Sequence, residues 1–163
     1  MKQLMTLMLV FLMSFSAVEA QKISKKEREA QAKLQVSELL ESGEFVFEAR
    51  NAQTMKGRQV NLTSNYTFSI SGDSVSADLP YFGRAYTAPY GGEGGIKFND
   101  KAESINKEYN SKKHTYRYEI DVKGERDHFN LILQIGETGF SSLSVNCNNR
   151  QPISFTGKLK LDE

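Results

Sequence analysis

The sequence predicts a mainly β domain, an antiparallel meander that curls into a barrel or a sandwich, preceded by one N-terminal helix. Hydrophobic residues recur at helical spacing only between about residues 24 and 42, and from about residue 44 onward they recur at every second position. The turns between the alternating segments also bring hydrophobic residues of adjacent strands opposite one another. A sheet of roughly seven to nine strands with one buried face must close on itself or fold over. The sequence does not choose between these two forms.

Residues 1–20 are predicted to be a cleaved export signal. Lys2 gives the segment a positive start, and an apolar run extends from Leu4 to Phe15. This run is too short to span a bilayer comfortably, and Val18-Glu19-Ala20 provides the residues that a signal peptidase reads. We therefore expect cleavage before Gln21 and export of the mature chain, with no transmembrane segment after cleavage.

The segment from about residue 24 to residue 42 is predicted to be an amphipathic surface helix. Ser24 and Glu27 have the spacing of a capping box, in which each side chain accepts a hydrogen bond from a backbone amide at the start of the helix. Gly43 provides the stop. A narrow hydrophobic stripe lies between these ends and consists of Ala32, Val36, Leu39 and Leu40.

From about residue 44, hydrophobic and polar residues alternate, as in strands that bury one face. The hydrophobic positions of these strands fall within Phe45–Ala49, Tyr66–Ile70, Val75–Leu79, His114–Val122, Phe129–Ile135, Leu143–Cys147 and Ile153–Leu161. Turns at 71–74, 124–127, 136–140 and 148–152 give these strands one antiparallel register. The register predicts the opposed pairs Ile70–Val75, Val122–Phe129, Ile120–Leu131, Tyr118–Leu133, Leu133–Leu143, Leu131–Val145, Ile135–Ser141, Cys147–Ile153 and Val145–Phe155.

Residues 21–163 are predicted to form a single β-rich domain. The composition, with 39% hydrophobic and 25% charged residues, is that of an ordinary globular protein. The net charge of +1 provides no field that would attract nucleic acid. The single Cys excludes an internal disulfide.

The few candidate catalytic or metal-binding residues do not come together in this register. His114 and His128 fall on opposite faces of a hairpin, about 30 Å apart at strand rise, and so cannot share a zinc ion. We expect His114 to be half-buried at a strand end and His128 to be exposed. Cys147 has the parity of the core positions and is expected to be a small core residue rather than a reactive thiol.

We therefore expect no metal, no cofactor and no catalytic residues. The glycine run at 91–95 lacks the Gly-Lys-Ser/Thr ending of a phosphate-binding loop. One catalytic alternative stays open, a hydrolase that uses a pair of carboxylates, because sequence does not give the distance between such groups. The carboxylates considered for it are Asp78, Glu93 and Asp100.

The segment 80–95 differs from the rest of the domain and is the predicted binding segment. A loop of this length is long for a compact domain, and long loops are usually functional. Tyr rings offer a flat apolar face and a polar tip for contact with a sugar, peptide or protein, and Arg offers paired donors for a carboxylate. The predicted binding residues are Tyr81, Phe82, Arg84, Tyr86 and Tyr90. The alternative is that these aromatic side chains only plug one end of the sheet.

Several stretches of the chain resemble an uncharacterised domain-of-unknown-function family of short exported proteins from Gram-negative gut bacteria. They are the export signal, the helix rich in Lys and Glu, Phe45–Arg50, Leu79–Tyr86 and Gly94–Phe98. The resemblance covers nearly the whole mature chain. It implies a location in the periplasm or outer envelope of a Gram-negative bacterium, and it implies no activity.

Two classes of function follow. The first is a non-catalytic envelope binding module that uses the segment 80–95 for a small molecule, glycan or peptide. The second is a structural or interaction protein that docks on an envelope partner. A deep cavity would favour the first class, and a filled core with exposed aromatic residues would favour the second.

Overall fold

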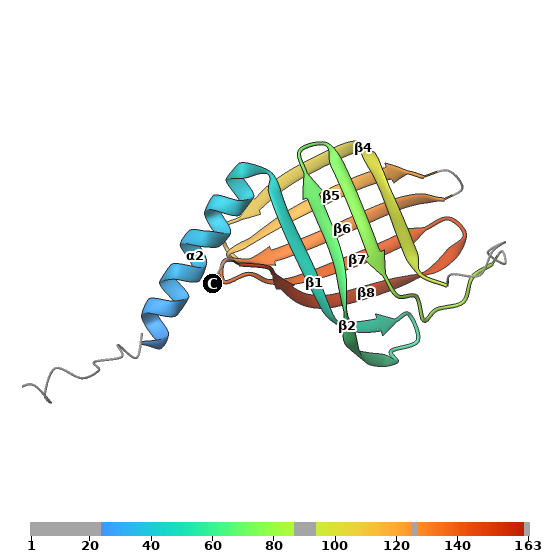
Figure 1. Cartoon of the computed structure of the whole chain (residues 1–163), viewed down its shortest axis with the longest axis horizontal. Helices are drawn as coiled ribbons and strands as arrows, with labels where there is room; N and C mark the ends of the chain where they lie inside the picture. Colours follow the sequence, from blue (N-terminus) through green and yellow to red (C-terminus); the bar gives the residue numbers. More distant parts are fainter. Residues whose placement is uncertain (1–23, 87–93, 125–126, 162–163) are drawn as a thin grey trace, which may run out of the picture.

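The computed structural model describes residues 24–86, 94–124 and 127–161, so the predicted export signal at 1–20 lies outside it. These residues form helix α2 (Lys25–Ser42) and the strands β1 (Glu44–Thr54), β2 (Gln59–Ser71), β3 (Ser74–Leu79), β4 (Ile96–Asn110), β5 (Thr115–Lys123), β6 (His128–Gly136), β7 (Phe140–Cys147) and β8 (Arg150–Leu159). Each strand pairs antiparallel with the next, and β1 also pairs with β8, so the sheet is a closed barrel (Figure 1). The predicted fold class is confirmed, in its barrel form. Within the described ranges, no helix has both the length and the apolar composition needed to cross a bilayer.

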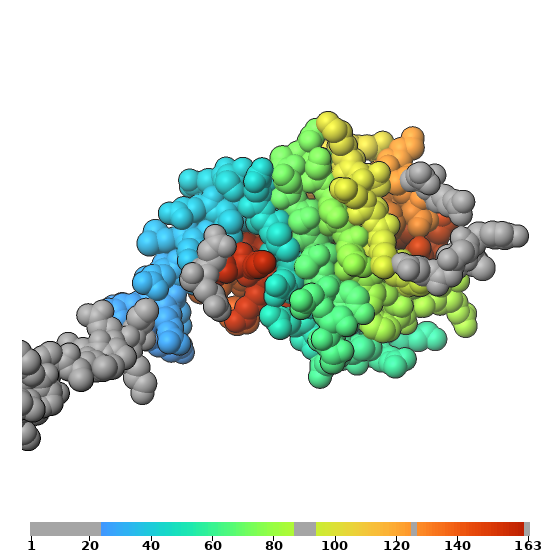
Figure 2. Space-filling model, in the orientation of Figure 1, coloured from blue at the N-terminus to red at the C-terminus, as the bar shows by residue number. Residues whose placement is uncertain are grey.

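Helix α2 begins and ends where the sequence predicts. The Glu27 amide donates to the Ser24 hydroxyl at 3.2 Å, and the Ser24 amide donates to the Glu27 carboxylate at 2.8 Å, which completes the capping box. Gly43 ends the helix in the left-handed conformation, with φ at 72°. Val36 and Leu40 of the predicted stripe are buried. The helix therefore covers one end of the barrel with its C-terminal half, and it projects beyond the barrel in the space-filling view (Figure 2).

The predicted registers of three hairpins are confirmed, and that of the fourth is wrong by two to three residues. The confirmed hairpins are β2–β3, β5–β6 and β6–β7. In β7–β8, the structure has the pairs Val145–Ile153 and Cys147–Arg150 in place of Val145–Phe155 and Cys147–Ile153. The chain reverses in a tight turn at 148–149 rather than a loop at 148–152, and a register shift follows on the way to Val145. The partner of Val145 is displaced by two residues, so the same β8 side chains still face the interior there, whereas the partner of Cys147 is displaced by three because of the register shift.

Strand β4 has no counterpart among the alternating segments of the sequence. Its inward positions include the polar Asp100, and a register shift between Ala102 and Ser104 changes which positions face inward. Residues 106–110 are exposed throughout. The hydrophobic alternation that predicts a strand is therefore missing from β4. It is interrupted by the inward Asp100 and by the register shift, and it is absent from the end of the strand, where side chains on both faces are exposed.

The interior of the barrel is filled by hydrophobic side chains. Phe47, Phe68 and Phe155 are completely buried, and they are packed among aliphatic side chains from every strand. These side chains occupy the space that a ligand would take in a hollow barrel. The hollows described below accordingly lie at the barrel ends and on the outer face of the sheet.

The two ends of the barrel differ. The helix end carries α2 and the turns at 72–73, 111–114 and 137–139. The loop end carries the turns at 55–58 and 148–149, the β5–β6 connection and the segment that follows β3, which leaves the barrel on the side opposite α2 (Figure 1). The predicted binding segment therefore lies at the loop end.

Candidate functional site

Four of the five predicted binding residues, Tyr81, Phe82, Arg84 and Tyr86, lie in the coil that follows β3, and Tyr90 lies outside the described residues. This coil is held against the β7–β8 turn by backbone hydrogen bonds. The Tyr86 amide donates to the Asn149 carbonyl at 2.9 Å, and the Gln151 amide donates to the Arg84 carbonyl at 3.1 Å. The coil is thus attached to the barrel rather than extended from it.

Tyr81 is the anchor of this coil. Its hydroxyl lies within hydrogen-bonding distance of two backbone carbonyl oxygens, those of Arg84 at 2.8 Å and Gln151 at 3.0 Å. Burial raises the pKa of the Tyr81 hydroxyl, which further favours the protonated form that donates hydrogen bonds. A Cβ at Gly83 would overlap this hydroxyl, which explains the glycine there. Through its hydroxyl, Tyr81 therefore holds the coil against the barrel.

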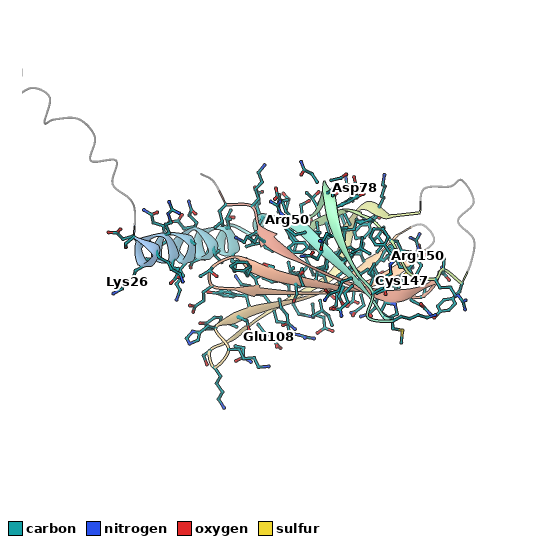
Figure 3. All side chains as sticks on the ribbon, turned by 90° about the horizontal axis from the view of Figure 1, so that it is seen from below. Lys26, Arg50, Asp78, Glu108, Cys147 and Arg150 are labelled. Carbon is teal, nitrogen blue, oxygen red and sulfur yellow. The ribbon has the colours of Figure 1, made fainter. Side chains whose placement is uncertain are left out.

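Arg150 is the second anchor, and sequence reasoning missed it. Its guanidinium donates to the Gly95 carbonyl at 2.6 Å, lies 3.5 Å from the Asp127 carboxylate, and has its central carbon 5.5 Å from the centre of the Tyr81 ring. Its side chain is only 16% exposed. The predicted loop at 148–152 concealed it, because an Arg in a loop is normally solvated. Figure 3 shows Arg150 and Cys147 close together at the loop end.

Phe82, Arg84 and Tyr86 are exposed. The exposed fractions of Phe82 and Tyr86 are 39% and 66%. Single exposed aromatic residues are normal on protein surfaces, but here two of them flank an exposed Arg on a coil whose backbone is fixed. The structure thus divides the predicted set into an anchor, Tyr81, and three side chains that are free to contact a partner.

A hollow of about 530 Å³ lies beside Tyr81, and we call it the Tyr81 hollow. It forms where the pairing of β2 with β3 stops, at Thr67 opposite Asp78. Its walls are supplied by Ser64, Asn65, Tyr66, Asp78, Leu79, Pro80, Tyr81, Gly94, Gly95 and Lys97. The strands involved lie side by side on the face shown in Figure 2, from green to yellow.

A large bulge in β2 builds one wall of the Tyr81 hollow. Along β1 the register moves two residues, from Asn51 to Ala49, while along β2 it moves five, from Asn61 to Tyr66. The additional residues of β2 include Ser64 and Asn65, which line the hollow. Bulges of this kind redirect side chains and are frequent beside binding sites. The sequence signal was the polar run before Tyr66, where the strand pattern is interrupted.

The chemistry of the Tyr81 hollow is polar and aromatic. Tyr66 and Tyr81 offer ring surface, Ser64 and Asn65 offer hydrogen-bonding groups, and the Lys97 ammonium lies 3.7 Å from the Asp78 carboxylate. Since those two charges compensate each other, the wall that they form is close to neutral. Such a site can stack a ring and bind several hydroxyl groups.

The carboxylates considered for hydrolysis do not form a pair in the described structure. Asp78 lies opposite Lys97 and Asp100 lies opposite Val75 in the β3–β4 ladder, so the two carboxylates are on opposite faces of the sheet. Glu93 lies outside the described residues. The carboxyl groups with a shifted pKa, those of Glu27, Asp73, Asp121 and Glu137, all have it lowered by hydrogen bonds. A general acid needs a shift in the other direction.

The two histidines and the cysteine also lie apart. His114 was predicted to be half-buried in a strand, which is wrong: it is exposed in the turn at 111–114 with φ at 51°, because β5 begins only at Thr115. His128 is exposed, as predicted. Cys147 is half-buried and packs on the core, and burial raises the pKa of its thiol. Within the described ranges, no three metal-ligating side chains are grouped.

Comparisons with known proteins place this arrangement in one family. No curated protein matches the chain. A crystal structure of a DUF4251 family protein from Bacteroides eggerthii is similar to it, with a TM-score of 0.63 and 17% sequence identity over 81% of this chain and 89% of the other. That similarity shows the same fold. Residues 27–159 match the family described as "Domain of unknown function (DUF4251)". The match includes most of α2, the paired strands β1 and β8 and the residues that line the Tyr81 hollow, and the chain therefore belongs to the DUF4251 family.

Proposed function

We propose that this protein is an exported, non-catalytic binding module of the Gram-negative envelope, and that it binds a short neutral glycan in the Tyr81 hollow. The observation that supports this most is the joint presence of two tyrosine rings and several hydrogen-bonding side chains in one hollow beside the predicted binding segment. The hollow has the volume of a small-ligand site. The export signal predicted at 1–20 supports the envelope location.

Because the interior of the barrel is filled, we place the ligand on the surface. Phe47, Phe68 and Phe155 fill the core of the described barrel, which argues against a central site for an apolar ligand. A neutral sugar suits the Tyr81 hollow better, since its ring faces are apolar and its edges carry hydroxyl groups. Asn65 and Ser64 can bind such hydroxyls, while Tyr66 and Tyr81 can cover the ring face.

The test is a titration of the protein with a panel of neutral mono- and disaccharides by calorimetry. Asn65→Ala removes one exposed hydrogen-bonding side chain from the hollow and is expected to weaken binding by roughly tenfold. Asn61→Ala is the matched control, because Asn61 is exposed on the same strand and does not line the hollow. Equal affinity of both variants, or no binding by any saccharide of the panel, would contradict the proposal.

The second candidate function is docking on an envelope protein through Phe82, Arg84 and Tyr86. The exposure of two aromatic side chains on a fixed backbone favours it. Tyr86→Ala separates the two candidates: it leaves the Tyr81 hollow intact, so saccharide affinity stays unchanged if the hollow is the site. Loss of a crosslinked envelope partner in Tyr86→Ala, with saccharides inert, would instead favour docking.

A further inference from the structure

Two adjoining hollows on the outer face of the barrel form a second surface feature, which we call the outer groove. The hollows have volumes of about 450 Å³ and 430 Å³, and both are lined by Thr115 and Gln134. The first extends over β6, β7, β8 and β1, and the second lies under the end of the β4–β5 hairpin. In Figure 3, Arg50 on β1 and Glu108 on β4 mark its two sides, with the strands of the sheet between them.

A bulge in β1 directs two polar side chains onto this face. Between Ala49 and Asn51 the register with β8 advances two residues on β1 and one on β8. As a result Arg50 and Asn51 are both exposed, although neighbours in a regular strand point to opposite faces. The sequence contains a trace of this bulge, since the buried alanines Ala49 and Ala52 are three residues apart instead of two.

The outer groove is basic in a chain that is almost neutral. Five basic side chains line it, and Glu108 is its one acidic lining residue among the described residues; the basic residues are Arg50, Lys112, Lys113, Arg117 and Lys158. Arg50 and Arg117 each have a neighbouring carboxylate outside the lining, at 3.0 and 3.5 Å. When those two carboxylates and Glu108 are counted, the five basic side chains still outnumber the three acidic ones. The whole chain, by comparison, has a net charge of +1.

The floor of the outer groove is hydroxylated, and one wall is aromatic. Ser142 and Thr156 lie opposite each other in the β7–β8 ladder, next to Gln134. Phe140 is 62% exposed, and the Lys158 ammonium lies 4.3 Å from the centre of its ring. Arg50 and Arg117 are four strand spacings apart, or about 19 Å along the surface. A ligand that uses both charges must therefore be a chain of several units.

We infer that the outer groove binds an acidic oligosaccharide, whose carboxylate or sulfate groups pair with the basic side chains while its hydroxyl groups contact the floor. An acidic peptide fits less well, because the strands β5 to β8 are paired on both sides and offer no backbone edge. A nucleic acid fits less well too, because the whole chain, with a net charge of +1, provides no extended positive field for a phosphate backbone. This site is separate from the Tyr81 hollow and its ligand is charged rather than neutral.

The test measures binding of oligogalacturonate to the full chain at low ionic strength. The double variant Arg117→Gln/Lys158→Gln removes two charges from the groove, and it is expected to bind roughly tenfold more weakly. The double variant Lys56→Gln/Arg58→Gln is the matched control: it removes the same charge from the exposed β1–β2 turn and is expected to bind like the native chain. Added salt should weaken the native interaction, because the groove charges are exposed.

Three results would overturn the inference. They are an equal loss in both double variants, binding of polyglutamate as tight as that of oligogalacturonate, and no preference of the native chain for oligogalacturonate over a neutral glucan of the same length. Asn65→Ala keeps the groove intact and is expected to bind oligogalacturonate normally. This variant distinguishes a failure of the outer groove from a failure of the Tyr81 hollow.

Discussion

At the scale of single residues, Arg150 contacts three separate segments of the loop end. It joins the segment after β3, the start of β4 and the β5–β6 connection through Tyr81, Gly95 and Asp127. Its partner Asp127 also accepts a hydrogen bond from the Asn149 side chain at 2.7 Å. Both members of the ion pair are largely buried, so removing one of them leaves the other desolvated and unpaired.

Arg150→Ala is therefore expected to lower the free energy of unfolding by about 2 to 4 kcal/mol. Urea denaturation followed by circular dichroism measures it. Arg50→Ala is the control, because the Arg50 side chain is 68% exposed and its ion pair with Glu48 is on the surface; its expected cost is within about 0.5 kcal/mol. Equal losses in the two variants would mean that Arg150 is not an anchor of the loop end.

Individual residues also show which parts of the candidate site could be predicted from the sequence. The composition of 80–95 was sufficient to select the loop end, because Tyr, Pro and Gly in this density are unusual for a connection. It could not separate Tyr81, which holds the coil, from Tyr86, which is exposed, because both have the same side chain. Arg150 could not be identified from the sequence, because its partners are up to 69 residues away in the chain.

At the scale of elements, Glu137 fastens α2 to the barrel. Its carboxylate accepts from the Lys33 ammonium of α2 at 2.7 Å, lies 3.0 Å from His114 Nδ1, and accepts from the Tyr109 hydroxyl at 3.1 Å. These contacts, with the hydrogen bond from Lys33 first, lower the pKa of Glu137 from 4.5 to about 2. Since the shift is downward, its stabilising effect is complete above the unfolded pKa and disappears as pH falls through the folded pKa.

The native chain is therefore expected to lose stability between about pH 5 and about pH 2, and Glu137→Gln is expected to lose less over the same interval. Urea midpoints measured across this range give the comparison. Glu38→Gln, on the exposed side of α2, is the control and should follow the native curve. If the native and Glu137→Gln midpoints differ by a constant amount from pH 7 to pH 2, Glu137 does not titrate as described.

The same scale explains which elements could be predicted. Helix α2 and the β5–β6 and β6–β7 hairpins follow local rules, namely a capping box and short turns between alternating strands. Strand β4 and the bulge of β2 at Ser64 do not, because their polar and irregular positions are stabilised by neighbours distant in sequence. The predicted register of β7–β8 is wrong for a related reason, since the alternation of hydrophobic residues does not reveal the register shift between Val145 and Cys147.

At the scale of the whole molecule, the barrel depends on the seam between its first and last strands. β1 pairs with β8 from Phe47 opposite Leu159 to Thr54 opposite Ile153, and the bulge at Arg50 interrupts this seam. Closure removes the two edges that an open meander would expose to other chains. The seam also positions the residues of β1 and β8 that line the outer groove, so the proposed binding site depends on closure of the barrel.

Gly157 is the residue on which the seam depends most. It lies opposite Ala49, next to the bulge, and a Cβ there would overlap the backbone carbonyl of Glu48. Backbone atoms cannot move aside as a flexible side chain can, so Gly157→Ala must push β8 away from β1. We expect this variant to lower the free energy of unfolding by about 3 kcal/mol, near the upper end for an overpacked site.

Urea denaturation and size-exclusion chromatography together test the importance of Gly157. Partial opening of the seam exposes two strand edges, so Gly157→Ala should also elute at a larger size than the native chain. Gly94→Ala is the matched control, because Gly94 is exposed and a Cβ there meets no atom within 4 Å; it should behave like the native chain. A Gly157→Ala variant that elutes like Gly94→Ala and is as stable would show that β1 and β8 do not approach closely at this point, and the orientation of Arg50 into the outer groove would then lose its basis.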